Sequence, residues 1–238
     1  MYTMGRIETS VYSTRDLCRF VQDALRKRAD PAKAVQMAAY MKTDMPFYGV
    51  QKPDRDPIYR TLQSTFVPGS LKAYADSVAA LWELPHREEK YAAIEFAIRH
   101  RKFITLEAMP LYERLIREGA WWDLVDPVAT VLVGRVLIDH RVEAGGILEQ
   151  WVGDGDMWIR RAAILAHLKH KDKTDVRQLF AHCLRLSGEK EFFIRKAIGW
   201  ALREYAKTAP VAVSAFLRTH RDALSPLSLR EASKHLPA

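Results

Sequence analysis

The sequence predicts an all-α protein built from repeated pairs of helices. Three observations support this prediction: apolar residues recur at helical intervals along nearly the whole chain, Gly and Pro number only 11 each and fall mostly between these stretches, and one motif returns in steps of 35 residues. We find no run of alternating strands and no βαβ unit. Hydrophobic residues make up 48% of the 238 residues, which is enough to bury a substantial core.

The periodic stretches place one helix after another along the chain. The segment 190–207 shows the pattern well, because Phe193, Ala197, Trp200, Ala201 and Tyr205 recur at helical spacing. We expect helices over residues 14–29, 31–43, 54–66, 70–83, 86–100, 104–118, 127–140, 143–151, 156–170, 174–186, 190–207, 210–219 and 226–235.

A period of 35 residues links several of these helices. Tyr91 begins the motif YAAI, and Arg161 begins RAAI two steps of 35 later; Lys196 stands one step further in FIRKA, and Asp126 stands midway. A weaker echo, one residue out of phase, lies at 227–232. Such a period is typical of α-solenoids of the HEAT or armadillo kind, although chance coincidence of short Ala-rich helices stays open. We expect one solenoid domain over residues 1–238, with these four residues along a concave, basic face.

The charge balance favours a polyanionic partner. Lys and Arg number 37 against 29 for Asp and Glu, a net charge of +8, which favours nucleic acid through phosphate neutralisation. A protein that is merely basic is the alternative. No apolar run approaches the roughly 20 residues of a membrane span, and the N-terminus lacks the apolar centre of a secretory signal. We expect a cytoplasmic protein that associates with the nucleoid when it acts on DNA.

Motifs for metals and cofactors are incomplete. The two cysteines cannot form a thiolate zinc site or a disulfide framework, and His167 and His170 lack a third ligand. The segment GDGD at 153–156 resembles part of a calcium loop, but Asp156 is better placed to cap the helix that begins at Met157. No dinucleotide-binding glycine motif, P-loop or GxSxG is present. We therefore expect neither a metal nor a cofactor.

The segment AWWDLVDP at 120–127 is the strongest candidate for chemistry. Two of the six tryptophans stand next to each other there, and side chains of adjacent helical residues point about 100° apart, so one can face the core while the other faces out. Trp122 and Asp126 are four residues apart and share a face if this segment is helical. Pro127 suits the first position of a helix, so the alternative role for Asp126 is an N-cap of the helix expected over 127–140.

Five blocks in order resemble those of a known family. They are YMK with FYGVQKPDR within 40–55, WELPHRE at 82–88, WWDLVD at 121–126, WIRRAAIL at 158–165 and EFFIRKAIGWALREYAK at 191–207. With them the chain resembles, over about residues 31–235, the DNA alkylation repair glycosylases built from HEAT-like repeats, the AlkD family. Each block alone is weak, but five in this order over nearly the whole chain are specific.

The resemblance implies a monofunctional DNA glycosylase that excises N3- or N7-alkylated purines, such as 3-methyladenine and 7-methylguanine, from double-stranded DNA. Asp126 would be the catalytic carboxylate, Trp122 and Trp200 would flank the sugar of the damaged nucleotide, and Arg161 would hold a backbone phosphate. Further DNA contacts would come from Tyr40, Lys42, Lys196 and Arg203. Pro127 directly after the aspartate departs from the family pattern and gives no reason to doubt its role.

One carboxylate and two tryptophans are a sufficient set of residues for excision of a cationic purine. Alkylation at N3 or N7 leaves the purine cationic, so the departing base needs no protonation and a second carboxylate becomes dispensable. One aspartate can stabilise the oxocarbenium-like sugar and position water, while each indole face adds about 0.5–2 kcal/mol of cation–π attraction. Nearby Arg and Lys are expected to keep Asp126 ionised, in opposition to burial.

Two other functions stay open. One is a non-catalytic HEAT-like protein that binds damaged or branched DNA, and the other is a protein-interaction scaffold. The combination of Asp126, Trp122 and Trp200 argues against a pure DNA binder, because such a protein needs no carboxylate that faces phosphate. The basic row of repeat positions argues against the scaffold. A monomer is the simplest assembly for a protein that wraps one lesion.

Overall fold

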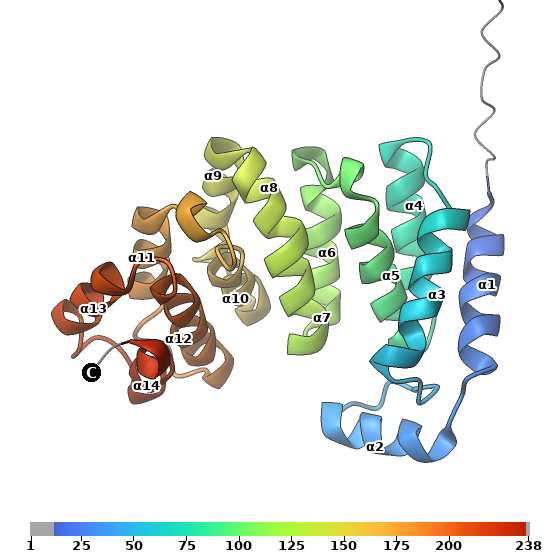
Figure 1. Cartoon of the computed structure of the whole chain (residues 1–238), viewed down its shortest axis with the longest axis horizontal. Coiled ribbons are helices and arrows are strands. Elements are labelled where there is room, and N and C mark those ends of the chain that lie inside the picture. The colour runs from blue at the N-terminus through green and yellow to red at the C-terminus, as the bar shows by residue number, and fades with distance from the viewer. Residues whose placement is uncertain (1–11, 237–238) are drawn as a thin grey trace, which may run out of the picture. The chain divides into compact units, whose positions relative to one another are not determined.

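The computed structural model describes residues 12–236, and within them the chain forms α-helices, short 3₁₀ turns and one π-helical segment, with no strand (Figure 1). This confirms the all-α prediction. The described residues pack as two compact units, 12–103 and 104–236.

The first unit contains five α-helices within its described residues, 12–103. They are α1 (Thr14–Arg26), α2 (Pro31–Met41), α3 (Lys52–Thr65), α4 (Leu71–Trp82) and α5 (Arg87–Arg99). Helix α1 packs on α4 and α5, and buries Leu17, Val21 and Leu25 on its apolar face. The side chains of Ser13, Asp30 and Ser70 accept hydrogen bonds from the first turns of α1, α2 and α4, so polar N-caps fix where these helices begin.

A buried carboxylate anchors the connection between α2 and α3. The Glu88 carboxylate accepts hydrogen bonds from the backbone N–H groups of Tyr48 (3.0 Å), Gly49 (2.8 Å) and Val50 (3.0 Å). The Glu89 carboxylate accepts a hydrogen bond from the Tyr48 hydroxyl (2.9 Å). Gly49 has φ +84°, and a Cβ there would lie 2.0 Å from the carbonyl oxygen of Asp30. Two of the blocks that carry the family resemblance therefore build the fold of this unit.

The second unit contains the remaining helices (Figure 1). They are α6 (Met109–Gly119), α7 (Trp122–Pro127), a π-helical segment (Val128–Val133), α8 (Gly134–Asp139), α9 (Arg141–Trp151), α10 (Met157–Leu165), α11 (Val176–Arg185), α12 (Phe192–Ala206), α13 (Pro210–Thr219) and α14 (Pro226–Ala232). Helix α12 lies against α10, α13 and α14, and Gly199 permits the closest approach, since a Cβ there would lie 2.5 Å from the Cβ of Glu231.

The helices expected from the sequence all have counterparts, and the largest difference lies around Pro127. The helix expected to begin there instead begins at Trp122 and runs through the π-helical segment to Asp139. The interpretation of Asp126 as an N-cap is therefore wrong, because Trp121 occupies the N-cap position and Asp126 lies inside the helix. Helix α10 also stops at Leu165, earlier than expected, before two residues with positive φ.

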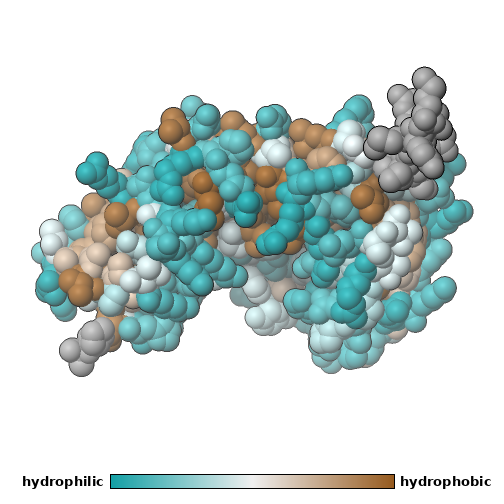
Figure 2. Space-filling view, turned by 45° about the horizontal axis from the view of Figure 1, so that its top comes forward, coloured by the Kyte–Doolittle hydropathy of each residue, from teal (hydrophilic) through white to brown (hydrophobic). Residues whose placement is uncertain are grey.

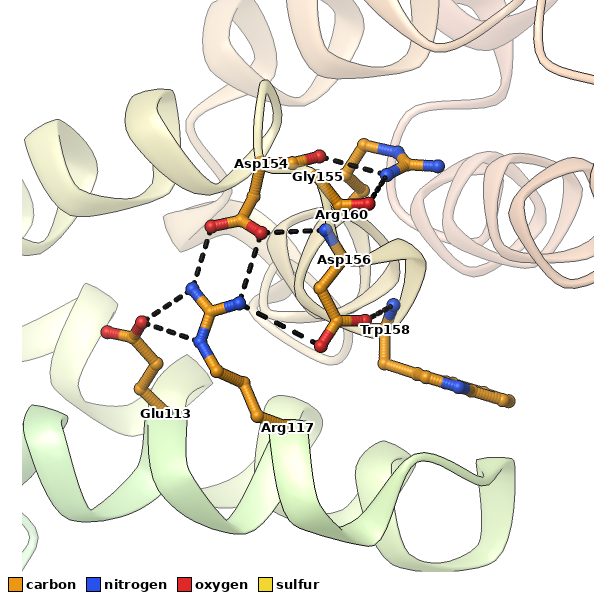
Figure 3. Close-up of polar contacts among 7 residues, drawn as sticks. All are labelled: Glu113, Arg117, Asp154, Gly155, Asp156, Trp158 and Arg160. Carbon is orange, nitrogen blue, oxygen red and sulfur yellow. Dashed lines mark hydrogen bonds and ion pairs between the residues drawn. The ribbon is translucent and has the colours of Figure 1, made fainter.

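The segment at 153–156 joins α6 to α10 through ion pairs (Figure 3). The guanidinium of Arg117 donates to both carboxylate oxygens of Asp154 (3.1 and 2.7 Å) and also to Glu113 (2.9 and 2.7 Å). The side chain of Asp156 accepts from the backbone N–H of Trp158 at 2.8 Å, so it caps α10 as predicted. Within residues 12–236, no group of three or more His, Cys, Asp or Glu side chains is arranged to hold a metal ion.

Hydrophilic side chains cover most of the face shown in Figure 2, and hydrophobic ones show between them. The exposed large apolar residues include Val35, Val142 and Val211. Over residues 12–236 no helix is both long and apolar enough to cross a membrane. Isolated apolar side chains of this kind are ordinary on a protein surface, so charge is the better guide to a partner.

Candidate active site

The side chains of Asp126 and Arg161 form a two-pronged ion pair between α7 and α10. The Nε and Nη2 atoms of Arg161 each donate to one carboxylate oxygen of Asp126, both at 2.8 Å. The Arg161 side chain is 4% exposed and the Asp126 side chain 14%. A planar guanidinium that grips both oxygens fixes the plane of the carboxylate as well as its position.

Arg161 is held from a third helix as well. Its Nη1 atom donates to the carbonyl oxygen of Phe193 at the start of α12 (2.5 Å), and its guanidinium carbon lies 5.8 Å from the centre of the Phe193 ring. Three of the five guanidinium N–H groups are thus used within the protein. The structure places Arg161 as the partner of Asp126, and its contact with a DNA phosphate stays a prediction that would use the two remaining N–H groups.

The backbone around Asp126 departs from a regular α-helix. Pro127 has no N–H to donate, and the wider π-helical turns of Val128–Val133 follow it directly. The hydroxyl of Thr130 donates to the carbonyl oxygen of Asp126 at 2.8 Å. Such π-helical turns are frequent at functional sites in helical proteins. Because α7 includes Trp122, this residue lies one turn before Asp126 on the same helix face, as the spacing predicts.

Burial raises the pKa of the Asp126 carboxyl above its ordinary value, Arg161 offsets part of that rise, and Asp123 adds to it. Arg161 thus acts against burial, as expected, and the ionised state of Asp126 at neutral pH stays a prediction. A carboxylate that is ionised yet poorly solvated is a stronger proton acceptor than an exposed one, which suits a residue that positions and activates water.

An aromatic cluster packs beside the ion pair. Trp121 packs against Trp158 (ring centres 5.9 Å apart) and Phe193 (5.4 Å), and the latter two pack on each other at 5.0 Å. The cluster joins the residue before α7 to the first turns of α10 and α12, the same three helices that hold the ion pair. It thereby stiffens the support of Asp126 and Arg161.

A second charged group lies between α12 and α14. Lys196, Trp200 and Arg203 recur at helical intervals and share one face of α12. Glu231 of α14 accepts hydrogen bonds from Lys196 (2.8 Å), Arg203 (2.7 Å) and Lys234 (2.8 Å). The bond from Lys196 and then that from Lys234 lower the pKa of Glu231 to about 2. Sequence reasoning missed Glu231, although it stands 35 residues after Lys196, where the repeat period points.

Comparison with known proteins identifies the family. A sequence model described as DNA alkylation repair enzyme matches residues 21–236. The chain belongs to this family. A solved structure described as a predicted DNA alkylation repair enzyme from Enterococcus faecalis is 32% identical, with a TM-score of 0.80 over 87% of this chain and 96% of that one. No curated protein sequence matches.

Membership of the DNA alkylation repair family confirms the predicted resemblance and supports a role in DNA repair with DNA as the substrate. The fold also agrees with the helical-repeat architecture expected of this family.

The first unit carries the two remaining candidate residues of the family pattern. Tyr40 lies in the last turn of α2 and is 71% exposed. Lys42 ends the same helix in a left-handed conformation (φ 51°) and is exposed. Their contacts with DNA stay predictions.

Proposed function

We propose that this protein is a monofunctional DNA glycosylase that hydrolyses the N-glycosidic bond of cationic N3- or N7-alkylated purines in double-stranded DNA. The observation that carries the proposal is the Asp126 carboxylate, poorly solvated and gripped by Arg161, one helical turn from Trp122 in a protein of the DNA alkylation repair family. 3-Methyladenine and 7-methylguanine are the simplest substrates of this class.

The reaction needs one anion and one water molecule. As the bond between C1′ and the purine nitrogen breaks, its electron pair neutralises the cationic base, which leaves without protonation. Positive charge develops on the sugar, and the Asp126 carboxylate stabilises it electrostatically. The same carboxylate orients a water for attack on C1′ and accepts its proton, since each oxygen keeps a lone pair beyond the one that Arg161 occupies.

The surrounding residues support this step. Indole rings of Trp122 and Trp200 would face the cationic sugar, and attraction to each is worth about 0.5–2 kcal/mol. Lys196 and Arg203 lie on the same face of α12 as Trp200 and would neutralise backbone phosphates, with Tyr40 and Lys42 as further DNA contacts from the first unit. The protein would act as a monomer, and no step requires a metal or a cofactor.

Release of free base tests the proposal directly. Wild-type protein is incubated with a duplex that carries one 7-methylguanine, and the free base is quantified. Appearance of 7-methylguanine together with an abasic site supports the glycosylase. Salt-sensitive binding of the duplex without release would identify a non-catalytic DNA-binding protein instead.

A further inference from the structure

A small cavity lies in the second unit where α10 and α12 end. It has a volume of about 200 Å³. Its lining is polar and basic: His167, Lys169, Lys171, Thr174, Glu204, Tyr205, Lys207 and Thr208. Three lysines face one glutamate, so the lining carries an excess of two positive charges. Glu204 accepts a hydrogen bond from Lys207 at 2.5 Å, so its charge is paired with Lys207 rather than with Lys169 or Lys171.

The backbone that presents two of these lysines is unusual. Lys169 has φ 64° and Lys171 has φ 55°, a left-handed conformation that is unfavourable for residues with a Cβ. His170 between them is buried, whereas both lysines are exposed. The turn therefore directs the imidazole inward and the two ammonium groups to the cavity, and such strain persists where the surroundings impose it.

A buried polar side chain lines the inner side of the cavity. His167 is 3% exposed, and neither of its ring nitrogens has a hydrogen-bond partner among the described residues. Burial, and to a lesser degree His182 and His170, lower the pKa of His167 well below its ordinary value. The ring is therefore neutral and has one N–H to donate. A buried donor without a partner, next to lysines, suits an anionic oxygen.

The cavity continues the candidate DNA-binding face of α12. Lys207 stands seven residues after Trp200, so it shares the face of Lys196, Trp200 and Arg203 and lies about 10 Å further along the axis. That distance corresponds to only a few nucleotide steps along a strand. DNA held at Trp200 would have phosphates within reach of the cavity.

We propose that this cavity binds a phosphodiester group of the DNA backbone beside the lesion, with Lys169, Lys171 and Lys207 as cationic contacts and His167 as a buried hydrogen-bond donor. The inference rests on the proposed function for the choice of DNA as the source of the anion. The Thr208 hydroxyl completes a lining suited to phosphate oxygens, while the Thr174 hydroxyl donates to the carbonyl oxygen of Lys171 (2.7 Å).

The test measures binding of an undamaged duplex against salt concentration for the variant Lys171→Gln/Lys207→Gln. The matched control is Lys173→Gln/Arg177→Gln, which removes the same charge from exposed residues that do not line the cavity. Loss of one phosphate contact should lower the slope of log K against log salt by roughly 0.9 and weaken binding about eightfold near 0.1 M salt. Equal slopes for the two variants would overturn the proposal.

A second measurement separates DNA from free phosphate as the ligand. Ring signals of ¹⁵N-labelled His167 are followed during titration with the undamaged duplex and, separately, with inorganic phosphate at the same ionic strength. We expect the signals to move with the duplex. A shift with inorganic phosphate and none with DNA would overturn the assignment to a backbone phosphodiester. Neither measurement needs base release, so failure here is distinguishable from failure of the glycosylase proposal.

Discussion

Asp126→Asn is the substitution that most directly tests the proposed chemistry. The amide has nearly the same shape as the carboxylate but carries no charge, so it cannot stabilise a cationic sugar or accept a proton from water. Removal of one preorganised electrostatic contact typically slows an enzyme about 10²–10³-fold, or about 2.7–4 kcal/mol. We expect at least that loss in the single-turnover rate of 7-methylguanine release, with binding of undamaged duplex unchanged or tighter.

The same change affects stability, and the structure sets the size of the effect. Asn can still accept one of the two hydrogen bonds from Arg161, so one charge-assisted bond worth about 1.5–3 kcal/mol is lost. Arg161 also loses its counter-charge while it stays buried, but relief of the buried carboxylate offsets part of this loss. A net loss of about 2 kcal/mol corresponds to a melting temperature lower by roughly 4–8 °C.

Asp154→Asn is the matched control. Asp154 is also gripped at both oxygens by an arginine in the same unit, and bonds from Arg117 lower its pKa to about 2, yet it has no role in the proposed reaction (Figure 3). The Asp154→Asn variant should be less stable than wild type by about 1 kcal/mol, because solvent screens this ion pair, and it should release base at the wild-type rate. Rates are compared below both melting transitions. A wild-type rate for Asp126→Asn, or equal slowing by Asp154→Asn, would refute the reasoning.

Three further predictions address the surroundings of the site and the fold. Trp200→Ala should slow base release more than it weakens binding of undamaged duplex, and equal losses would make Trp200 a packing residue. Glu231→Gln should lower the free energy of unfolding by about 2 kcal/mol above pH 5, and this difference from wild type should vanish as the pH falls towards 2. The folded-state pKa of Glu231 is depressed, so its contribution to stability is present above the unfolded-state pKa and lost in acid. A difference that does not change with pH would contradict the ion-pair explanation. Gly49→Ala should lower stability by about 3 kcal/mol, because its Cβ would meet the carbonyl oxygen of Asp30; a thermal melt close to that of wild type would show that the loop between α2 and α3 can shift.

Most of the fold can be predicted from the sequence because the signals for each helix lie in its own residues. Apolar spacing and polar N-caps such as Asp30 and Asp156 act over a few residues, so they are readable without tertiary information. Pro127 is the exception. Proline is a good first residue of a helix and a poor interior one, but the π-helical turns after it accommodate the missing N–H. That accommodation depends on packing and leaves no local signal.

The partners of charged residues are harder to predict, since stacking of helices decides them. The family resemblance assigns Arg161 to a phosphate, whereas in the structure it grips Asp126, and Lys196 and Arg203 share Glu231. One signal is nevertheless present in the sequence. Both Asp126–Arg161 and Lys196–Glu231 span 35 residues, the repeat period, so equivalent positions of successive repeats meet in space.

The repeat by itself therefore explains an ion pair at these positions, and a different property must distinguish a functional carboxylate from a structural one. Glu231 and Asp154 have pKa values lowered to about 2 by their cationic partners, as expected of groups whose ionised form the fold stabilises. Asp126 has a partner with ideal two-pronged geometry, yet burial raises its pKa. Burial thus disfavours the ionised form of Asp126, whereas the partners of Glu231 and Asp154 favour theirs. Perturbed pKa values are common at functional sites, which supports our proposal that Asp126, rather than Glu231, acts in the reaction.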